Sequence, residues 1–598
     1  MTVLSAAEKS IPKLGSLGND LFVPFKVRKY KKSEVLWLNE RWLLENNINI
    51  FNPDIRNDIV NWLLTEYGVG CRTSEQPSKQ FVGKTTTMYA DRYGGTNGTP
   101  QGGSGRCGTR GNFNAKGIGK TPLVSEFVDS GHKNGFLPLA EALCEVIFSE
   151  IANGETPYGS IPVLAILSTG HKHEFQKENG VEACAIVVRS NFVRPAHFER
   201  SIFFGDSGTK CSQQYLDAKR VQSAITTAQN ASAINNIQFN NLEEIFLKFA
   251  TQIGSCHANR LWSGQFLSSN MSVCGAFVDF GSFRSVYSWQ RAVGLSSQIF
   301  GREGTSIRSA YKSLKFNFDK FSAKPQIRRK SFFDEFENLI THEIEHSFLN
   351  TSKSNFPINN KSSRKSAKYF AKLMLEYFQH QQKLRYHISM SSDWTTRRPW
   401  LLHALENKSK TKYPYDTIEQ ELSKEIENLV FTSANKADVA PDLAMASLVN
   451  WFKPRPSLFH ENITRKTKLI SKKIKLGKPE NSLRIKNFIN SSIARNRRSW
   501  TNKPQNFHIS AQSSDGTTFA LFGYYKNYDK KMVWLHGHII DNQAILFGQF
   551  IPLKLIEKQI KVKGFKYNAL ISYISNKGSP EVFFGDIRIK LQPPMFKY

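Results

Sequence analysis

Apolar residues recur along the first half of the chain with two different spacings. Helical spacing is found in LPLAEALCEVIFSEIANG (137–154), which ends near a glycine, and in NLEEIFLKFATQIG (241–254). Short runs rich in β-branched residues, PVLAILST (162–169) and VEACAIVVRS (181–190), predict strands. Helical and strand patterns are therefore both present, and we expect an α+β fold.

The flanking regions have simpler patterns. Residues 1–70 carry apolar residues at helical spacing and predict helices with irregular segments, and residues 325–435 predict mostly helix. From about residue 506, alternating apolar and polar positions separated by turns such as SSDG and NKGS predict a compact β-rich domain. A chain of 598 residues is too long for one hydrophobic core, so several domains are expected.

The charge of the chain is strongly positive and unevenly distributed. Its formal net charge is +31, which attracts polyanions without choosing among them. Residues 453–503 contain fifteen Lys and Arg against two acids. We interpret this segment as a solvated surface or connector. The alternatives are an amphipathic basic helix or a contact with nucleic acid or an acidic partner, although few aromatic residues are interleaved for base stacking.

The cysteines and the hydropathy profile predict a cytoplasmic, soluble protein. The seven cysteines are scattered and form no C-x-x-C pair, so neither a disulfide framework nor a zinc ribbon is expected. The N-terminal residues lack the apolar core of a signal peptide, and no run of about 18 apolar residues predicts a transmembrane segment.

Candidate chemistry lies between residues 83 and 281. A glycine-dense stretch (83–121) predicts a tight hairpin whose backbone can approach a ligand. The stretch NMSVCGAFVDF (270–280) predicts a strand that ends at Asp279. Asp279 is also the first residue of Asp-Phe-Gly (279–281), the tripeptide that holds Mg²⁺ in protein kinases. No H-R-D-L-x-x-x-N catalytic loop precedes it.

The polar residues of this region follow the order of parts in a kinase-like nucleotide site. Such sites need a glycine-rich lid, a lysine held by a helix glutamate, and an Asn/Asp pair whose oxygens suit Mg²⁺. Here the order is Lys116, Glu145 on a predicted helix, Arg189 and Arg194 after a strand, then Asn270 and Asp279.

Five motifs in this region resemble the selenoprotein O family of kinase-fold protein adenylyltransferases. They are YGGTNGTPQGGSGRCGTRG (Y-[AG]-G-H-Q-F-G…Q-L-G-D-G-R-A in the family), NAKGIGKTPL (Q-L-K-G-x-G-x-T-P-[YF]), EVIFSEIANGETPYGSIP (R-E-F-L-x-S-E-A-M-x-x-L-G-I-P), VRSNFVRPAHFE (R-V-A-x-S-x-x-R-x-G-H-F-E) and SSNMSVCGAFVDFGSF (T-D-N-M-S-x-x-G-x-x-x-D-Y-G-P-[FY]). The motifs occur in the family's order and cover residues 90–285, about a third of the chain.

The resemblance implies a protein-kinase-like, two-lobed fold that binds ATP and Mg²⁺ and transfers AMP, or phosphate, to a hydroxyl of a protein or peptide acceptor. It implies that Lys116 contacts the phosphates and pairs with Glu145, and that Asn270 and Asp279 bind the metal. The implied nucleotide-binding residues are Gly102, Gly103, Gly105, Arg106, Lys116, Arg189 and Arg194. With the resemblance placing a kinase-like domain at 76–325, the sequence patterns give the rest of the expected organisation: a helical segment (1–75), a helical region completing that domain or separate from it (326–450), a basic segment (451–505) and a β-rich domain (506–598).

The chain departs from the family at three places. Ser269 replaces the acid that the family uses as a general base, Ser104 replaces a second acid, and TNG replaces His-Gln-Phe in the lid. Because a dissociative transfer needs little base assistance, the first hypothesis is that the chain is an active transferase. The second hypothesis is that it is a pseudokinase subunit that binds nucleotide and scaffolds a modification complex, with a partner subunit on its C-terminal domain. The third hypothesis is that it is a nucleic-acid-associated protein that uses its basic surface.

Two other motifs are weaker. The sequence THEIEH (341–346) places His342 and His346 one helical turn apart, as in zinc proteases, but we interpret it as a charged, solvated helix face. GKTTT (83–87) and GKTP (119–122) lack the upstream glycine of a P-loop.

Overall fold

The computed structural model describes most of the chain up to residue 322 and parts of the remainder. The described stretches are 14–71, 80–95, 102–124, 133–175, 181–201, 210–230, 239, 241–264, 266–286, 300–301, 303–322, 455–475, 477–496, single residues between 342 and 425, and the backbone of seven strands between 509 and 590.

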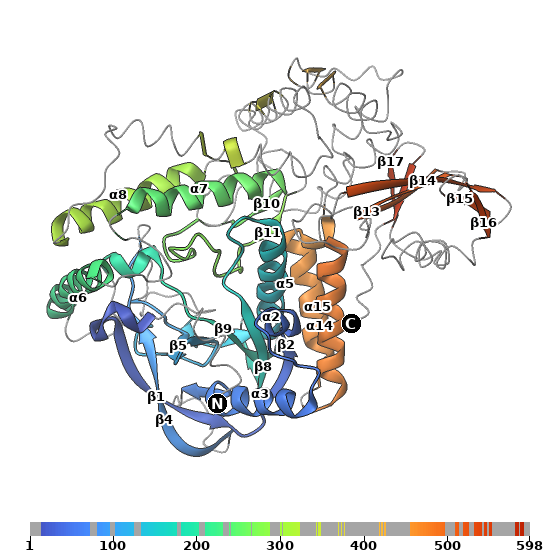
Figure 1. The fold of residues 1–598 in the computed structure, drawn as a ribbon. Helices are drawn as coiled ribbons and strands as arrows, with labels where there is room; N and C mark the ends of the chain where they lie inside the picture. The colour runs from blue at the N-terminus through green and yellow to red at the C-terminus, as the bar shows by residue number, and fades with distance from the viewer. Residues whose placement is uncertain are drawn as a thin grey trace.

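A nine-stranded antiparallel sheet organises the first 190 residues (Figure 1). Its strands follow the order β2-β8-β9-β6-β5-β4-β1-β3, and β7 pairs with β9. The strands are β1 (Phe22–Tyr30), β2 (Glu34–Leu38), β3 (Val69–Cys71), β4 (Phe81–Asp91), β5 (Cys107–Arg110), β6 (Phe113–Lys116), β7 (Leu137–Pro138), β8 (Val163–Glu174) and β9 (Val181–Ser190).

The alternation of side chains along a strand separates two hydrophobic cores, one on each face of this sheet. On β9, Ala185 and Val187 belong to one core, whereas Ile186 and Val188 belong to the other. The second face is covered by α2 (Glu40–Glu45) and α3 (Pro53–Glu66), which begin at asparagine caps. The first face is covered by α5 (Leu139–Glu155).

Further helices extend the core on the α5 side. They are α6 (Lys210–Asn230), α7 (Leu242–Ala258) and α8 (Glu303–Phe321), and each adds buried apolar residues to the core that contains α5. Between α7 and α8 lies a short two-stranded sheet made of β10 (Leu261–Trp262) and β11 (Arg284–Ser285).

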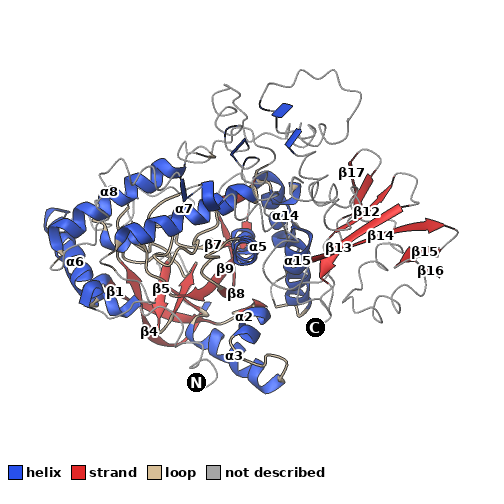
Figure 2. Ribbon diagram, turned by 45° about the horizontal axis from the view of Figure 1, so that its top comes forward, coloured by secondary structure: helices blue, strands red, loops and turns tan. Residues whose placement is uncertain are grey.

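The basic segment folds into two helices that return to α5 across about 300 residues of sequence. These are α14 (His460–Lys473) and α15 (Glu480–Asn496), which lie beside α5 in Figures 1 and 2. Ile463, Ile485 and Ile489 are buried in the core that contains α5. Arg455 just before α14 forms a buried salt bridge of 2.8 Å with Glu155 at the end of α5. The segment is therefore part of the fold and not a connector.

The C-terminal strands form a second sheet of their own, with the order β16-β15-β14-β13-β12-β18-β17. The strands are β12 (Ile509–Ser513), β13 (Thr518–Tyr524), β14 (Met532–Ile540), β15 (Gln543–Leu546), β16 (Gln549–Pro552), β17 (Glu581–Phe584) and β18 (Ile587–Lys590). Every pairing in this sheet is antiparallel, which confirms the β-rich pattern predicted from about residue 506.

The α+β class is confirmed, one local prediction is incomplete and another is wrong. The N-terminal region contains the predicted helices, as α2 and α3, but also β1, β2 and β3, which belong to the main sheet. Residues 270–280 do not form a strand but a tight turn structure closed by a bridge between Met271 and Phe277. Most of the predicted helical region 326–450 lies outside the described residues. Among the described residues, no helix is long and apolar enough to cross a membrane.

Candidate functional site

Lys116 and Glu145 form a buried ion pair between the sheet and α5. Phe113 and Ala115 of β6 face the α2/α3 side, so the strand period turns Lys116 toward α5. There its Nζ lies 2.8 Å from Oε2 of Glu145, and both side chains are at most 2 % exposed. Lysine is rarely buried without a partner, so the pair expected from the motif order is formed in the interior.

Asp279 joins this pair from a distant part of the chain. Its Oδ1 lies 3.0 Å from Nζ of Lys116, and its side chain is 36 % exposed. Burial alone would raise the pKa of Asp279, but Lys116, Arg106 and Arg189 outweigh it and hold the pKa below its usual range. The pKa of Lys116 is raised, because Asp279 and Glu145 outweigh the opposing effect of burial. Both groups are therefore charged at neutral pH.

Glu141 is a further member of the network that the sequence reasoning missed. It lies one turn before Glu145, which puts both carboxylates on one face of α5. Its Oε1 accepts a hydrogen bond of 2.6 Å from Arg106 and lies 3.5 Å from Nζ of Lys116. The i, i+4 spacing to Glu145 was the available signal, but it does not reveal which helix face meets the sheet.

Asn270 and Asp279 are brought together by the turn structure between them. The N–H of Val278 donates to the carbonyl oxygen of Asn270 at 3.0 Å, and Met271 bridges to Phe277. Asp279 itself has φ +65°, a conformation that non-glycine residues rarely adopt and that recurs at functional sites. A carboxylate and an amide oxygen fit the ligand preference of Mg²⁺, whose remaining positions are usually filled by water and phosphate.

The acidic cluster in this region already holds a cation of its own. Ligand atoms of Glu141, Glu145 and Asp279 lie within 4.8 Å of one another, a grouping that could hold a metal ion. The ammonium of Lys116, however, lies within 3.5 Å of all three carboxylates. A metal ion held by these three carboxylates would have to displace Lys116 from that position. Asp279 and the amide oxygen of Asn270 are oxygen ligands of the type that Mg²⁺ prefers.

The two candidate arginines are buried and differ in their partners. Arg189 on β9 donates to Oε1 of Glu145 at 2.9 Å, so Glu145 binds Lys116 with one oxygen and Arg189 with the other. Arg194 donates to the carbonyl oxygen of Ser269, and its guanidinium lies 4.4 Å from the ring centre of Phe192. Arg189 thus belongs to the Lys116 network, and Arg194 fixes the backbone next to Asn270.

The described glycines of the glycine-rich segment form backbone hydrogen bonds and close contacts within the protein. The N–H of Gly102 donates to the carbonyl oxygen of Leu123, so it is not free for a phosphate as the sequence led us to expect. Gly103 has φ +145°, and a Cβ there would overlap the carbonyl oxygen of Asp91. The carbonyl oxygen of Gly105 accepts from the N–H of Thr121. Of the residues predicted here, Arg106 is the one whose side chain enters the network.

Ser104 supports a buried carboxylate that comes from β4. Its hydroxyl donates to Oδ1 of Asp91 at 2.6 Å, and Nε2 of His197 lies 2.9 Å from Oδ2. Nδ1 of His197 accepts from the N–H of Arg194, which leaves Nε2 as the protonated nitrogen that donates to Asp91. Burial lowers the pKa of His197 despite this partner. An acid at position 104 would face Asp91, so the two carboxylates are alternatives.

Among the contacts described, no carboxylate next to Ser269 replaces the acid that the family has at this position. Its hydroxyl lies 3.4 Å from Oδ1 of Asn270. Glu199 and Asp206 are two acids of the sequence that could act as a base in place of the family's acid. Glu199 is 2 % exposed and accepts a hydrogen bond from Ser268. Burial raises the pKa of Glu199 to about 7. It lies beneath the turn structure and not at its surface. The other acid, Asp206, is outside the described residues.

The histidines of THEIEH lie apart from this network. The rings of His342 and His346 stack with centroids 6.3 Å apart, as expected one helical turn apart. Oε1 of Glu343 accepts from Thr251 at 2.6 Å. In the part of the chain that is described, these histidines belong to no group of three potential metal ligands.

Comparisons of the sequence with protein-family models and with curated proteins found no match. The functional proposals therefore rest on the residues and their geometry.

Proposed function

We propose that the chain is a Mg·ATP-dependent transferase of protein-kinase-like fold, similar to the protein adenylyltransferases of the selenoprotein O family. The observation that carries the proposal is Lys116, buried between Glu145 at 2.8 Å and Asp279 at 3.0 Å. Such a lysine–glutamate pair beside a metal-binding aspartate is the arrangement that positions phosphates in kinase-like sites. Perturbed, buried ionic groups of this kind are typical of functional sites.

Each residue has a role in the proposed reaction. When bound, Mg²⁺ would be held by Asn270 and Asp279 and would neutralise charge on the phosphates. Lys116 would hold a phosphate oxygen, and Glu145 would orient the ammonium. Arg106 is the most accessible guanidinium of the network, with an 11 % exposed side chain. It would exchange Glu141 for a phosphate oxygen when nucleotide enters.

The transferred group is AMP or phosphate, and the acceptor is a hydroxyl of a protein or peptide. In AMP transfer the acceptor oxygen bonds to the α-phosphorus as the bond to pyrophosphate breaks. In phosphoryl transfer it bonds to the γ-phosphorus as the bond to ADP breaks. The acceptor proton passes to solvent or to a phosphate oxygen, because Ser269 is a poor base near neutral pH. A loose transition state tolerates this arrangement.

A second function is supported by the same position. Ser269 replaces an acid, and Glu199 is buried beneath it, so the site retains its cation-binding groups without an evident base. A pseudokinase subunit that binds nucleotide and scaffolds a partner would need only the retained groups.

Isotope transfer separates these functions. The full chain is incubated with Mg²⁺ and ATP labelled on either the α- or the γ-phosphate, with the chain itself and the proteins of a cell extract as acceptors. Protein labelled only from α-labelled ATP indicates AMP transfer, and protein labelled only from γ-labelled ATP indicates phosphoryl transfer. Both labels should be lost in Asp279→Asn and kept in Glu244→Gln, which changes a surface acid on α7. Nucleotide binding without either label supports the subunit, and absence of binding contradicts both functions.

A further inference from the structure

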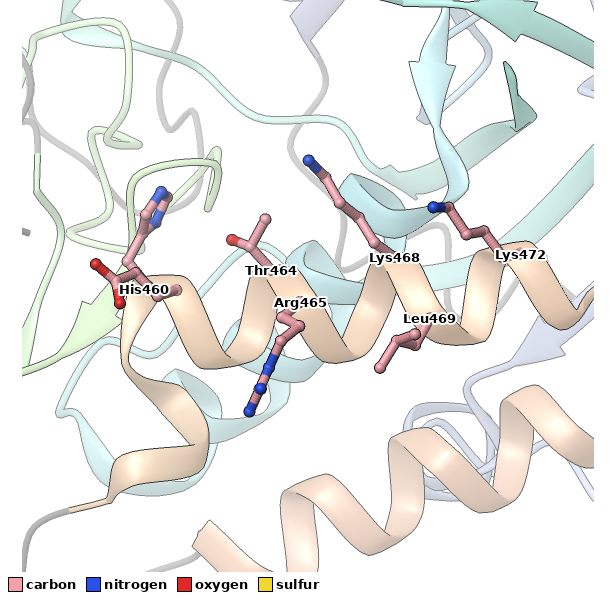
Figure 3. Close-up of a pocket in the computed structure, with 7 residues that line it drawn as sticks. His460, Thr464, Arg465, Lys468, Leu469 and Lys472 are labelled. Atoms are coloured by element: carbon pink, nitrogen blue, oxygen red, sulfur yellow. The ribbon is translucent and has the colours of Figure 1, made fainter. Parts of the chain in front are cut away.

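The two faces of α14 differ in charge. Ile463, Thr467 and Ser471 are buried toward the body of the protein, and Thr467 contacts Cys144 of α5. Away from this face, α14 lines a groove of about 420 Å³. The groove residues are His460, Glu461, Thr464, Arg465, Lys468, Leu469 and Lys472. Figure 3 shows that Arg465 projects from one side of the helix and Lys468 and Lys472 project from the other.

Some cations of the helical hairpin formed by α14 and α15 anchor it to the fold, and others are exposed. Arg455 and Lys486 make salt bridges of 2.8 Å with Glu155 and Glu40, which anchor the hairpin to the rest of the chain. Arg465 and Lys473 are exposed and have no ion pair with any described carboxylate. The anchored cations are thus used by the fold, whereas the outer ones contribute to a field that points to solvent.

Nearby acids do not cancel this field. Glu461 is the one acid of the groove. Glu182 on β9 lies near Lys468 and Lys472 and is a second acid, so these two acids face the three cations Arg465, Lys468 and Lys472. Burial and the positive charges of Arg284 and Lys468 lower the pKa of His460 to about 4. At neutral pH the histidine is therefore uncharged, and lysine and arginine supply the positive charge.

We propose that the outer face of α14 binds the phosphate backbone of a nucleic-acid duplex. Arg465, Lys468 and Lys472 recur every three or four residues, so the helix presents a cation about every 4.5–6 Å along its axis. Thr464 adds a hydroxyl, and arginine, lysine and threonine are usual contacts of phosphate oxygens. The absence of aromatic residues from the groove is consistent with backbone contacts and not with stacking on single-stranded bases.

Other polyanions fit this face less well. An amphipathic helix binds a membrane by inserting its apolar face, but the apolar face of α14 is buried against the protein, and Ile463 is 3 % exposed. Protein interfaces are depleted of lysine and enriched in aromatic residues, which is the opposite of this groove. The surface therefore has the composition of an electrostatic contact that reads no sequence.

The expected signature is a dependence of affinity on salt. Each phosphate neutralised adds about −0.9 to the slope of log K against log salt for B-DNA, so three cations predict a contribution of about −2.7. Between 50 and 200 mM salt this contribution weakens binding about 40-fold. Removing two of the cations should make the slope shallower by about two units.

The test is a titration of the full chain with a fluorescent 20-base-pair duplex at several KCl concentrations. The variant Arg465→Gln/Lys472→Gln removes two groove cations. Lys312→Gln/Lys320→Gln on α8 makes the same charge change at two exposed positions elsewhere. We expect the groove variant to flatten the slope by about two units and the α8 variant to change it by less than half as much. Equal effects of the two variants would overturn the proposal.

Two competitors test the identity of the partner. Unlabelled duplex should displace the probe, whereas polyglutamate or phosphatidylserine vesicles of equal total charge should displace it at least tenfold less well. Equal displacement by either competitor contradicts a nucleic-acid surface. Asp279→Asn should leave the duplex affinity unchanged, so this proposal and the proposed transferase function can fail separately.

Discussion

Replacing Glu145 by glutamine tests whether the buried network holds the two cations in place. Glutamine has nearly the same shape, but it replaces a carboxylate that accepts two charged donors by an amide with one oxygen and one NH₂. In the native chain Oε2 accepts from Lys116 at 2.8 Å and Oε1 from Arg189 at 2.9 Å. In the variant one of these donors must face the NH₂ group.

The cost follows from the burial of all three groups. Each side chain is at most 3 % exposed, so water cannot replace the lost partner. Removing one member of a buried ion pair typically costs about 3–5 kcal/mol. For a domain of this size a loss of that order lowers the midpoint of thermal unfolding by roughly 10 °C. Lys116 would also interact more strongly with Asp279, which should weaken Mg·ATP binding.

Urea unfolding followed by circular dichroism measures the free energy, with Glu244→Gln as the matched control. Glu244 makes the same type of pair with Lys248 at 2.9 Å, but its side chain is 52 % exposed. Exposed pairs contribute about 0–1 kcal/mol. The reasoning is refuted if Glu145→Gln and Glu244→Gln lower the free energy of unfolding by the same small amount.

Three further predictions concern individual contacts. Ile463→Ala should cost about 2–5 kcal/mol and weaken nucleotide binding by loosening α5, whereas Leu469→Ala, at a side chain 52 % exposed, should change stability by less than about 0.5 kcal/mol; equal losses in chemical denaturation would contradict this. The raised pKa of Glu199, about 7 against an ordinary 4.5, means that the folded state keeps the proton longer than the unfolded state, so stability is present below pH 4.5 and falls as pH rises through 7. In Glu199→Gln this decline should be absent, so the free energy of unfolding at pH 8, taken relative to pH 4.5, should exceed that of the native chain by on the order of 3 kcal/mol. An unchanged pH profile would contradict this prediction. Ser104→Asp should destabilise the chain at pH 7 more than Ser104→Ala does and recover at low pH, because it faces Asp91; a variant as stable as Ser104→Ala at both pH values would show that the carboxylates do not meet.

The parts that the sequence predicts well are those encoded by local pattern and motif order. The run 181–190 is a strand over its whole length, and 137–154 lies almost entirely in α5. The pairing of Lys116 with Glu145 followed from their order relative to the metal-site residues. In the N-terminal segment, VPFKVR alternates apolar and other residues in the strand period, so the sequence carries a local signal for β1 beside the helical ones.

The remaining features depend on contacts between distant residues. The stretch 270–280 has the composition of a strand, but Gly275 and bridges from Phe277 to Met271 and Ser160 turn it into a loop. Glu141 became visible only when the face of α5 that meets β6 was known. The docking of α14 on α5 joins segments about 300 residues apart, and a charge-rich pattern alone predicts solvent exposure.

Isothermal titration with ATP is the decisive test of the proposal that Lys116, Glu145, Asn270 and Asp279 form a Mg·nucleotide site. We expect saturable binding that requires Mg²⁺. We also expect Asp279→Asn to weaken binding about 100-fold or more, since even outer partners of a metal site contribute 10–100-fold. Glu244→Gln should bind as the native chain does. Absence of Mg-dependent binding by the native chain, or equal binding by Asp279→Asn, would contradict the claim.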